Sequence, residues 1–116
     1  MAAGELAQYS IAFAIEIVNY YKWLVNEKKE YVMSKQILRS GTSIGANIHE
    51  ANYAISKADF ISKMQIAMKE TAETEYWLKV LTETGFYDKG FQSLNTRLIS
   101  IKKMLISTLN TTKREG

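Results

Sequence analysis

The sequence contains no cysteine and no proline, and it has a single histidine among its 116 residues. Without cysteine there can be no disulfide, no thiolate zinc site and no cysteine nucleophile. Proline costs about 3 kcal/mol in a helix interior, so its absence is typical of long uninterrupted helices. No apolar run approaches the roughly 18 residues of a membrane-spanning helix, and residues 1–20 lack the pattern of a signal peptide. We therefore expect a cytoplasmic protein with no membrane association.

The length and the hydrophobic content of 47% fit one globular domain, residues 1–116, with one core. Apolar residues recur at three- and four-residue steps in segments of the chain near 5–29, 32–53, 56–83 and 91–112. Short polar turns join these segments, and no segment shows the alternation of a strand. The pattern predicts an all-α fold, an antiparallel up-down-up-down four-helix bundle.

Local signals predict where the third helix begins and ends. Ser56 and Asp59 have the spacing of an N-cap and its reciprocal acid. Gly85 follows the last periodic residue, where a left-handed C-terminal cap is expected. We expect Phe86 and Tyr87, in the following loop, to fold back and close one end of the core.

The segment 39–51 has few bulky side chains, although it lies between strongly periodic segments. At about 100° per residue, one side of its helix collects Ile37, Ile44, Ile48, Ala51 and Ile55. Gly41 and Gly45 lie one turn apart on a shoulder of that stripe. Each glycine costs roughly 1 kcal/mol relative to alanine, so we expect a neighbouring backbone or aromatic ring to approach closely there.

Some apolar residues are surplus to a single core. In the first segment they are Ile11, Ile15 and Val18, which fall partly outside the main stripe, and in the last they are Ile99 and Ile106. Apolar side chains that a monomer cannot bury indicate a subunit interface, so we expect a homo-oligomer.

The sequence can be compared with two catalytic arrangements, the di-iron site of some four-helix bundles and a serine hydrolase site. Di-iron bundles use Glu-x-x-His pairs, but this sequence has only Asn47-x-x-Glu50 and Glu70-x-x-Glu73. His49 has no obvious orienting group for serine hydrolysis. We therefore expect no catalytic residue, no metal and no cofactor.

The polar residues instead predict a hydrogen-bonded network beside the core, formed by Arg39, Ser40, Ser43, Asn47, Glu50, Glu70 and Glu73.

The formal net charge is +3, and residues 90–114 contain no acid. The basic side chains of this stretch are Arg97, Lys102, Lys103, Lys113 and Arg114. They could contact the phosphates of RNA or DNA, or they could simply form a solvated face. In a ring of subunits the same side chains would repeat and their potentials would add.

The run at 39–48, RSGTSIGANI, followed by Glu50-Ala51, closely resembles the hallmark of the 23S rRNA intervening-sequence proteins. The resemblance continues through Lys57, Asp59-Phe60, Ala67, Lys69-Glu70 and residues 73–78. It implies homopentameric four-helix bundles around a central axis, without enzymatic activity. The family is similar to the accessory variability proteins of diversity-generating retroelements, which are pentameric and basic and bind nucleic acid and a reverse transcriptase.

These observations lead to two functional hypotheses. The first is a non-enzymatic homopentamer that binds RNA or DNA electrostatically. The alternative is a scaffold that binds a protein partner and makes no nucleic-acid contact. The family name records a gene location, so it does not prove that rRNA is the target.

Overall fold

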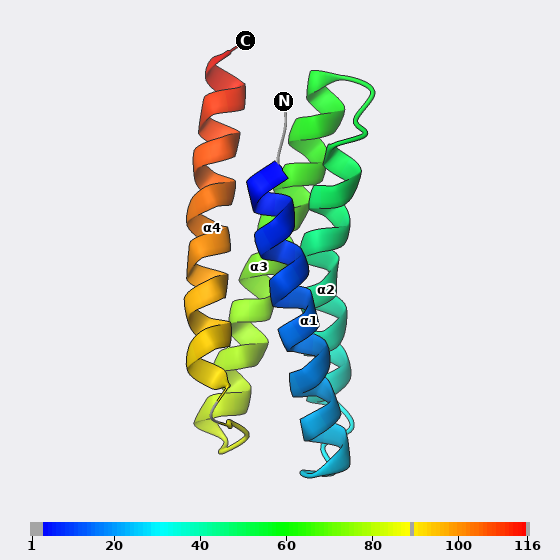
Figure 1. The fold of residues 1–116 in the computed structure, drawn as a ribbon, viewed down its shortest axis with the longest axis vertical. Helices are drawn as coiled ribbons and strands as arrows, with labels where there is room; N and C mark the ends of the chain where they lie inside the picture. Colours follow the sequence, from blue (N-terminus) through cyan, green and yellow to red (C-terminus); the bar gives the residue numbers. More distant parts are fainter. Residues whose placement is uncertain (1–3, 89, 116) are drawn as a thin grey trace.

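Four α-helices account for most of residues 4–88 and 90–115, the ranges that the computed structural model describes. The helices are α1 (Gly4–Asn26), α2 (Met33–Ala51), α3 (Lys57–Glu83) and α4 (Phe91–Arg114), and no strand occurs in these ranges. They lie along the 48 Å axis of the molecule, and successive helices run in opposite directions (Figure 1). The predicted all-α four-helix bundle is confirmed.

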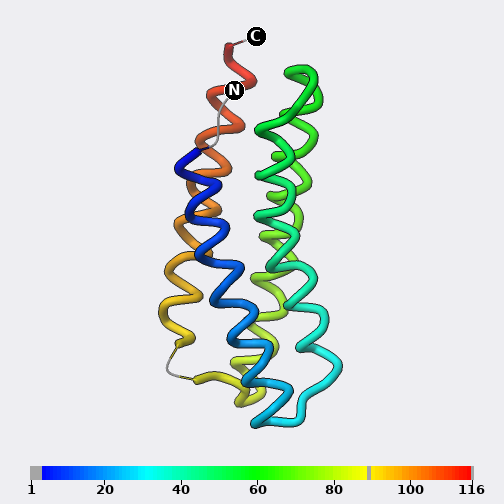
Figure 2. Tube along the Cα trace, turned by 45° about the vertical axis from the view of Figure 1, so that its right-hand side comes forward, coloured from blue at the N-terminus to red at the C-terminus, as the bar shows by residue number. Residues whose placement is uncertain are grey.

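The helices are arranged in chain order around one core. Each packs against its neighbours in sequence, and α4 completes the arrangement by packing against α1 (Figure 2). The edge between α1 and α2 is therefore opposite the edge between α3 and α4. The largest fully buried side chains come from all four helices and include Phe13, Ile17, Leu24, Ile37, Ile44, Ile48, Phe60, Met64, Leu81, Ile101 and Leu105.

The predicted stripe of α2 is confirmed up to Ala51 and is wrong for Ile55. Helix α2 ends at Ala51, and the backbone N–H groups of Tyr53 and Ala54 donate to the carbonyls of Glu50 and Ala51 in a turn. The side chain of Ile55 is 94% exposed as a result. The turn moves this residue off the helical face on which the periodicity placed it.

A glutamate that precedes α2 determines where this helix begins. The Glu30 carboxylate accepts hydrogen bonds from the backbone N–H groups of Val32, Met33 and Ser34, at 3.1, 3.1 and 2.6 Å. Lys29 just before it has a φ of 56°, in the left-handed region. The free N–H groups of the first turn are thus satisfied from outside the helix, which lets α2 begin without a capping side chain on Val32.

Both predicted boundaries of α3 are confirmed. Ser56 Oγ accepts from the Asp59 N–H at 3.0 Å, while Asp59 Oδ2 accepts from the Ile55 N–H at 3.1 Å. Gly85 has a φ of +92°, and the Phe86 N–H donates to the Leu81 carbonyl at 2.8 Å. This is the left-handed helix ending that glycine favours.

The loop after Gly85 closes the core with one of its two aromatic rings. Phe86 packs against the core, whereas Tyr87 is exposed and its ring lies 6.5 Å from the Phe91 ring. The expectation that both rings would fold back is correct only for Phe86. Tyr20 Oη donates a hydrogen bond to the Phe86 carbonyl and so fastens the loop to α1.

Candidate functional site

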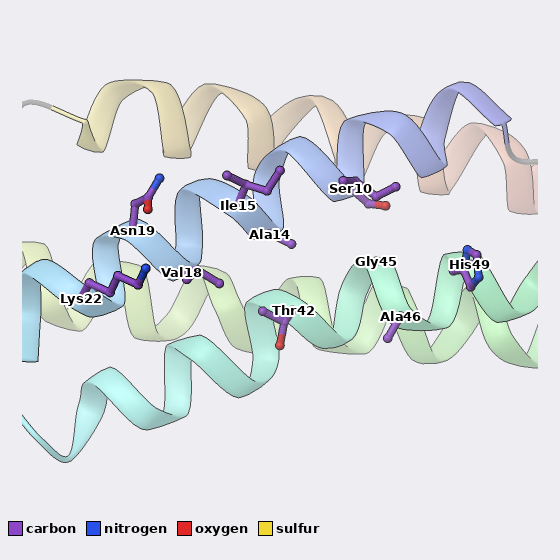
Figure 3. Close-up of a pocket in the computed structure, with 11 residues that line it drawn as sticks. Ser10, Ala14, Ile15, Val18, Asn19, Lys22, Thr42, Gly45, Ala46 and His49 are labelled. Carbon is purple, nitrogen blue, oxygen red and sulfur yellow. The ribbon is translucent and has the colours of Figure 1, made fainter.

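A groove of about 560 Å³ runs along the outside of the bundle between α1 and α2 (Figure 3). Lys22 and His49 lie at its two ends in this view. Its lining is mainly apolar and contains no carboxylate: Ser10, Ile11, Ala14, Ile15, Val18, Asn19 and Lys22 come from α1, and Thr42, Gly45, Ala46 and His49 from α2. A surface of this kind can bind an apolar side chain or a helix more readily than a charged ligand.

The small residues of α2 allow α1 to approach closely beside this groove. A Cβ atom on Gly41 would lie 2.9 Å from Ile17 Cγ1. One on Gly45 would lie 3.2 Å from Ser10 Oγ and 3.4 Å from the Ser10 carbonyl oxygen. The predicted close approach is confirmed at both glycines, and the neighbour is α1. The expected backbone contact is found at Gly45, whereas the neighbour of Gly41 is the aliphatic side chain of Ile17 rather than a backbone or an aromatic ring.

The surplus isoleucines are exposed in the single chain, as the sequence predicts. Ile11 and Ile15 on α1 are 55% and 59% exposed, and Ile99 and Ile106 on α4 are 45% and 42% exposed. Val18 is half-buried in the wall of the groove. The subunit interface that these side chains suggest stays a prediction.

The residues expected to form one polar network lie in separate groups. In the first, Arg39 on α2 pairs with two carboxylates of α3, with Glu70 at 3.1 Å and with Glu73. Trp77 Nε1 also donates to Glu73, at 3.1 Å. The hydrogen bond from Arg39 lowers the pKa of Glu73, and the same bond raises the pKa of Arg39. This group links α2 to α3 at the surface, because the Arg39 side chain is half exposed.

Ser40 and Glu50 contact α3 independently of that group. Ser40 is fully buried and accepts a hydrogen bond from Thr74 Oγ1 at 3.0 Å. Glu50 pairs with Lys63 Nζ at 3.1 Å near the other end of α2. The sequence hypothesis did not include Thr74, Lys63 or Trp77, although Trp77 follows Glu73 by one helical turn.

Ser43 and Asn47 bond to the backbone of their own helix. Ser43 Oγ donates to the Arg39 carbonyl at 2.7 Å, and Asn47 Nδ2 donates to the Ser43 carbonyl at 2.9 Å. Short polar side chains often bond to the carbonyl one turn earlier. The structure therefore does not join all seven predicted residues into one network.

Two of the five basic residues of α4 are neutralised by acids from other helices. Arg97 Nε lies 2.7 Å from Glu16 Oε1 on α1, and Lys102 Nζ lies 3.2 Å from Glu75 Oε1 on α3. The remaining three are exposed and form no salt bridge within the described ranges: Lys103, Lys113 and Arg114. We refer to these three residues as the α4 cation cluster.

The histidine and the acids outside these groups form no recognisable metal site in the described part of the chain. No three His, Asp or Glu side chains of residues 4–88 and 90–115 are placed to hold a metal ion. His49 is exposed, and its ring lies 5.5 Å from the ring of Tyr53. Within the same ranges no helix has the length and hydropathy needed to cross a bilayer.

The similarity to known proteins extends over the whole bundle. A model of the 23S rRNA-intervening sequence protein family matches residues 4–107. A crystal structure of a protein of unknown function from the S23 ribosomal protein family of Bacteroides thetaiotaomicron is 54% identical to this chain, with a TM-score of 0.90. That match covers 95% of this chain and 99% of the other. No curated protein matches the chain.

Proposed function

This chain belongs to the 23S rRNA-intervening sequence protein family, and we propose that it is a non-enzymatic homo-oligomer that binds RNA or DNA through phosphates. The observation that carries the nucleic-acid part is the α4 cation cluster. Its three side chains are exposed and form no salt bridge with any side chain of residues 4–88 and 90–115. Phosphate contacts from such side chains supply most of the affinity of non-specific nucleic-acid binding.

Support for assembly comes from the four exposed isoleucines of α1 and α4. Burying apolar surface contributes about 25 cal/mol per Å², so an oligomer that covers these side chains is favoured. A pentamer is the form that the family resemblance implies. Rotational symmetry would repeat the α4 cation cluster once in every subunit, and the summed potential would attract a phosphate backbone.

Little sequence preference is expected from this mode of binding. Contacts to phosphates position a protein on a nucleic acid but carry no base information directly. The cluster lies on a bundle helix rather than on an element with a known base-reading geometry. Binding at micromolar concentration, with similar affinity for unrelated sequences, follows from this arrangement.

The absence of catalysis is part of the proposal and rests on how the polar side chains are used. Ser43, Asn47 and Thr74 each donate to a helix carbonyl or to another hydroxyl, and Arg39 binds two carboxylates. Arg39 and Thr74 link α2 to α3, whereas Ser43 and Asn47 bond within α2, and none of these groups is arranged as a nucleophile with its base.

Fluorescence anisotropy with labelled RNA and DNA oligonucleotides of equal length tests the nucleic-acid part. We expect binding at about 50 mM salt that weakens by orders of magnitude toward about 200 mM, because counterions are released from each contacted phosphate. Light scattering on the same samples reports the assembly. Failure to bind either nucleic acid at the lower salt concentration would contradict the proposal.

A protein-binding scaffold is the second candidate, and the apolar groove between α1 and α2 favours it. The pairing of Arg97 and Lys102 with acids also favours it, because it leaves less free positive charge on α4. An assembled protein that bound no nucleic acid at low salt would support this candidate over the first.

A further inference from the structure

The geometry points to a nucleotide-binding pocket between α1 and α4, in which Arg97 binds the phosphate and Tyr9 stacks on the base. This inference goes beyond the proposed function, because its ligand is a free nucleoside monophosphate rather than a polymer bound at the α4 cation cluster. The pocket has a volume of about 420 Å³, which is within the usual range for small-molecule sites. Tyr9 of α1 lines it together with five residues from the first half of α4: Gln92, Ser93, Thr96, Arg97 and Ser100.

The residues that α4 contributes lie together because of their helical spacing. Ser93, Arg97 and Ser100 are separated by four and then three residues, so they share one side of the helix. Thr96 is three residues after Ser93 and four before Ser100, and so adjoins both. The guanidinium of Arg97 therefore has hydroxyl groups of its own helix around it.

Arg97 is held in place by Glu16 of α1. Its Nε donates to Glu16 Oε1 at 2.7 Å, and the Ser93 hydroxyl donates to the same oxygen at 2.9 Å. The two Nη groups of Arg97 form no hydrogen bond with residues 4–88 and 90–115. A guanidinium can bind phosphate with two parallel N–H groups, so the free edge of Arg97 suits a phosphate. Because Glu16 balances the charge of Arg97, these hydrogen bonds, rather than net charge, supply the affinity.

Other polar groups of the pocket are available to donate hydrogen bonds. The hydroxyls of Tyr9, Thr96 and Ser100 form none with the part of the chain that the structure describes. The hydroxyls of Thr42 and Thr82, by contrast, donate to carbonyls one turn earlier in their own helices. A phosphate monoester has three strongly accepting oxygens, and so it can satisfy a guanidinium edge and neighbouring hydroxyls together.

Tyr9 supplies a surface on which a flat ring can stack. Its side chain is 38% exposed and contacts no other aromatic ring within the described ranges. Tyr9 precedes Glu16 by seven residues, or about 10.5 Å along the helix axis. Since α1 and α4 run in opposite directions, Tyr9 lies toward Ser100 as seen from Arg97 (Figure 1). A phosphate on Arg97 therefore directs the base toward Tyr9. Purines and pyrimidines should both bind, because every base has a face that can stack.

The pocket lies apart from the exposed isoleucines. Lys102 pairs with an acid of α3, whereas Arg97 pairs with an acid of α1, so these two side chains extend from different sides of α4. Ile99 and Ile106 lie three residues before Lys102 and four residues after it, on the side nearest α3. None of the exposed isoleucines lines the pocket. An assembly that covers them therefore need not cover the pocket.

Isothermal titration calorimetry of the full chain with AMP, adenosine and inorganic phosphate tests the inference. We expect AMP to bind with a Kd below about 1 mM. Adenosine and inorganic phosphate each keep only one of the two contacts, so each should bind about tenfold more weakly or worse. Absence of heat with AMP at about 1 mM, or equal affinity for adenosine, would overturn the inference.

Substitutions of the two proposed contact residues assign the binding to this pocket. Arg97→Gln can still donate to Glu16 but loses the paired Nη groups, so AMP should bind about tenfold more weakly and adenosine unchanged. Tyr9→Ala should also weaken AMP by about tenfold, whereas Tyr9→Phe keeps the ring and should bind like the wild type. Wild-type affinity in Arg97→Gln or in Tyr9→Ala would overturn the inference.

Lys102→Gln is the matched control for Arg97→Gln. It also removes one positive charge and one ion pair between helices, but on the side of α4 nearest α3. Its affinity for AMP should equal that of the wild type, and a tenfold loss would show that the pocket is not the site. Circular dichroism melting verifies that each variant folds. Should Arg97→Gln unfold, Thr96→Glu replaces it, because Thr96 is exposed and the added carboxylate should repel the phosphate.

A nucleotide within a strand shares the chemistry of a free nucleotide, and competition separates the two. The measurement uses about 200 mM salt, at which non-specific binding to phosphates is weak. An excess of a single-stranded oligonucleotide should leave AMP bound. Displacement of AMP would assign the pocket to the polymer and overturn the inference. A protein that binds AMP in this way but binds no oligonucleotide at low salt would contradict only the proposed function.

Discussion

Ile17 of α1 lies directly against Gly41 of α2, so that a Cβ atom on Gly41 would be 2.9 Å from Ile17 Cγ1 and 3.0 Å from its Cγ2. Both residues are buried. The approach is possible only because Gly41 has no side chain, which explains why a costly helical glycine is present here.

Replacing Gly41 with leucine should destabilise the fold. The added side chain would collide with Ile17, and overpacking of this kind costs about 1–3 kcal/mol or more. The better helix propensity of leucine offsets less than about 1 kcal/mol of that. Urea denaturation measures the difference. Gly4→Leu is the matched control, since nothing lies within 4 Å of a Cβ at Gly4, and equal stability of the two variants would contradict the close contact.

Protonation of Glu73 should account for part of the decrease in the free energy of unfolding at acidic pH. The hydrogen bond from Arg39 lowers the pKa of Glu73 below its ordinary 4.5, so the folded state binds this proton less readily than the unfolded chain. The resulting stabilisation is present above about pH 4.5 and is lost as the pH falls through the folded pKa. Both side chains are partly exposed to solvent, which screens the pair, so the contribution should be below about 1 kcal/mol.

Denaturation of Glu73→Gln between about pH 6 and pH 3 measures that contribution. The free energy of unfolding should decrease less steeply with acid than in the wild type. Arg39→Gln should also make the free energy of unfolding fall less steeply over this pH range. Adding Glu73→Gln to Arg39→Gln should change the profile little, because Arg39 is the partner that lowers the pKa of Glu73. Identical pH profiles for Glu73→Gln and the wild type would rule the effect out.

Tyr20→Phe should loosen the loop between α3 and α4. Burial, with the nearby charges of Asp88 and Glu30, raises the pKa of Tyr20, so its hydroxyl remains a donor to the Phe86 carbonyl at neutral pH. Losing that hydrogen bond should cost about 0.5–1.5 kcal/mol in thermal unfolding. Tyr87→Phe is the control, because the Tyr87 side chain is exposed, and a similar loss there would contradict the assignment.

Removing the α4 cation cluster should weaken nucleic-acid binding and reduce its salt dependence. The variant carries Lys103→Gln, Lys113→Gln and Arg114→Gln. The slope of log affinity against log salt should decrease by up to about 0.9 for each phosphate that the variant no longer binds. Lys102 is left unchanged, because its ion pair with Glu75 would confound the result.

A second triple variant controls for net charge. It carries Lys29→Gln, Lys35→Gln and Lys79→Gln, which lie between α1 and α2, near the start of α2 and near the end of α3. These ends of the helices lie at the opposite end of the bundle from the C-terminal end of α4 (Figure 1). This variant loses the same three positive charges, and we expect it to bind nucleic acid more tightly than the variant of the α4 cation cluster. Equal affinities of the two variants would mean that the overall charge, rather than the α4 cation cluster, determines binding. Melting and assembly should be unchanged in both, as is usual for surface substitutions.

The helices and their buried faces could be predicted from the sequence because they depend on residues close together in the chain. A stripe such as Phe13 and Ile17 follows from helical periodicity. The boundaries at Ser56 and Gly85 follow from side-chain and backbone preferences within a single turn. Periodicity also places Ile11 and Ile99 outside the core-facing stripes of their helices. Their exposure could therefore be predicted, because one core can bury only one face of each helix.

The polar contacts were decided by the tertiary structure. Arg97 looked free within its acid-free helix, yet its partner is Glu16, 81 residues away in the chain. Ser40 was grouped with its helical neighbours, but its hydroxyl meets Thr74 on α3. Periodicity gives the face on which a side chain lies. Its partner depends on how far each helix is rotated and shifted along its neighbour, and packing of the whole core determines that.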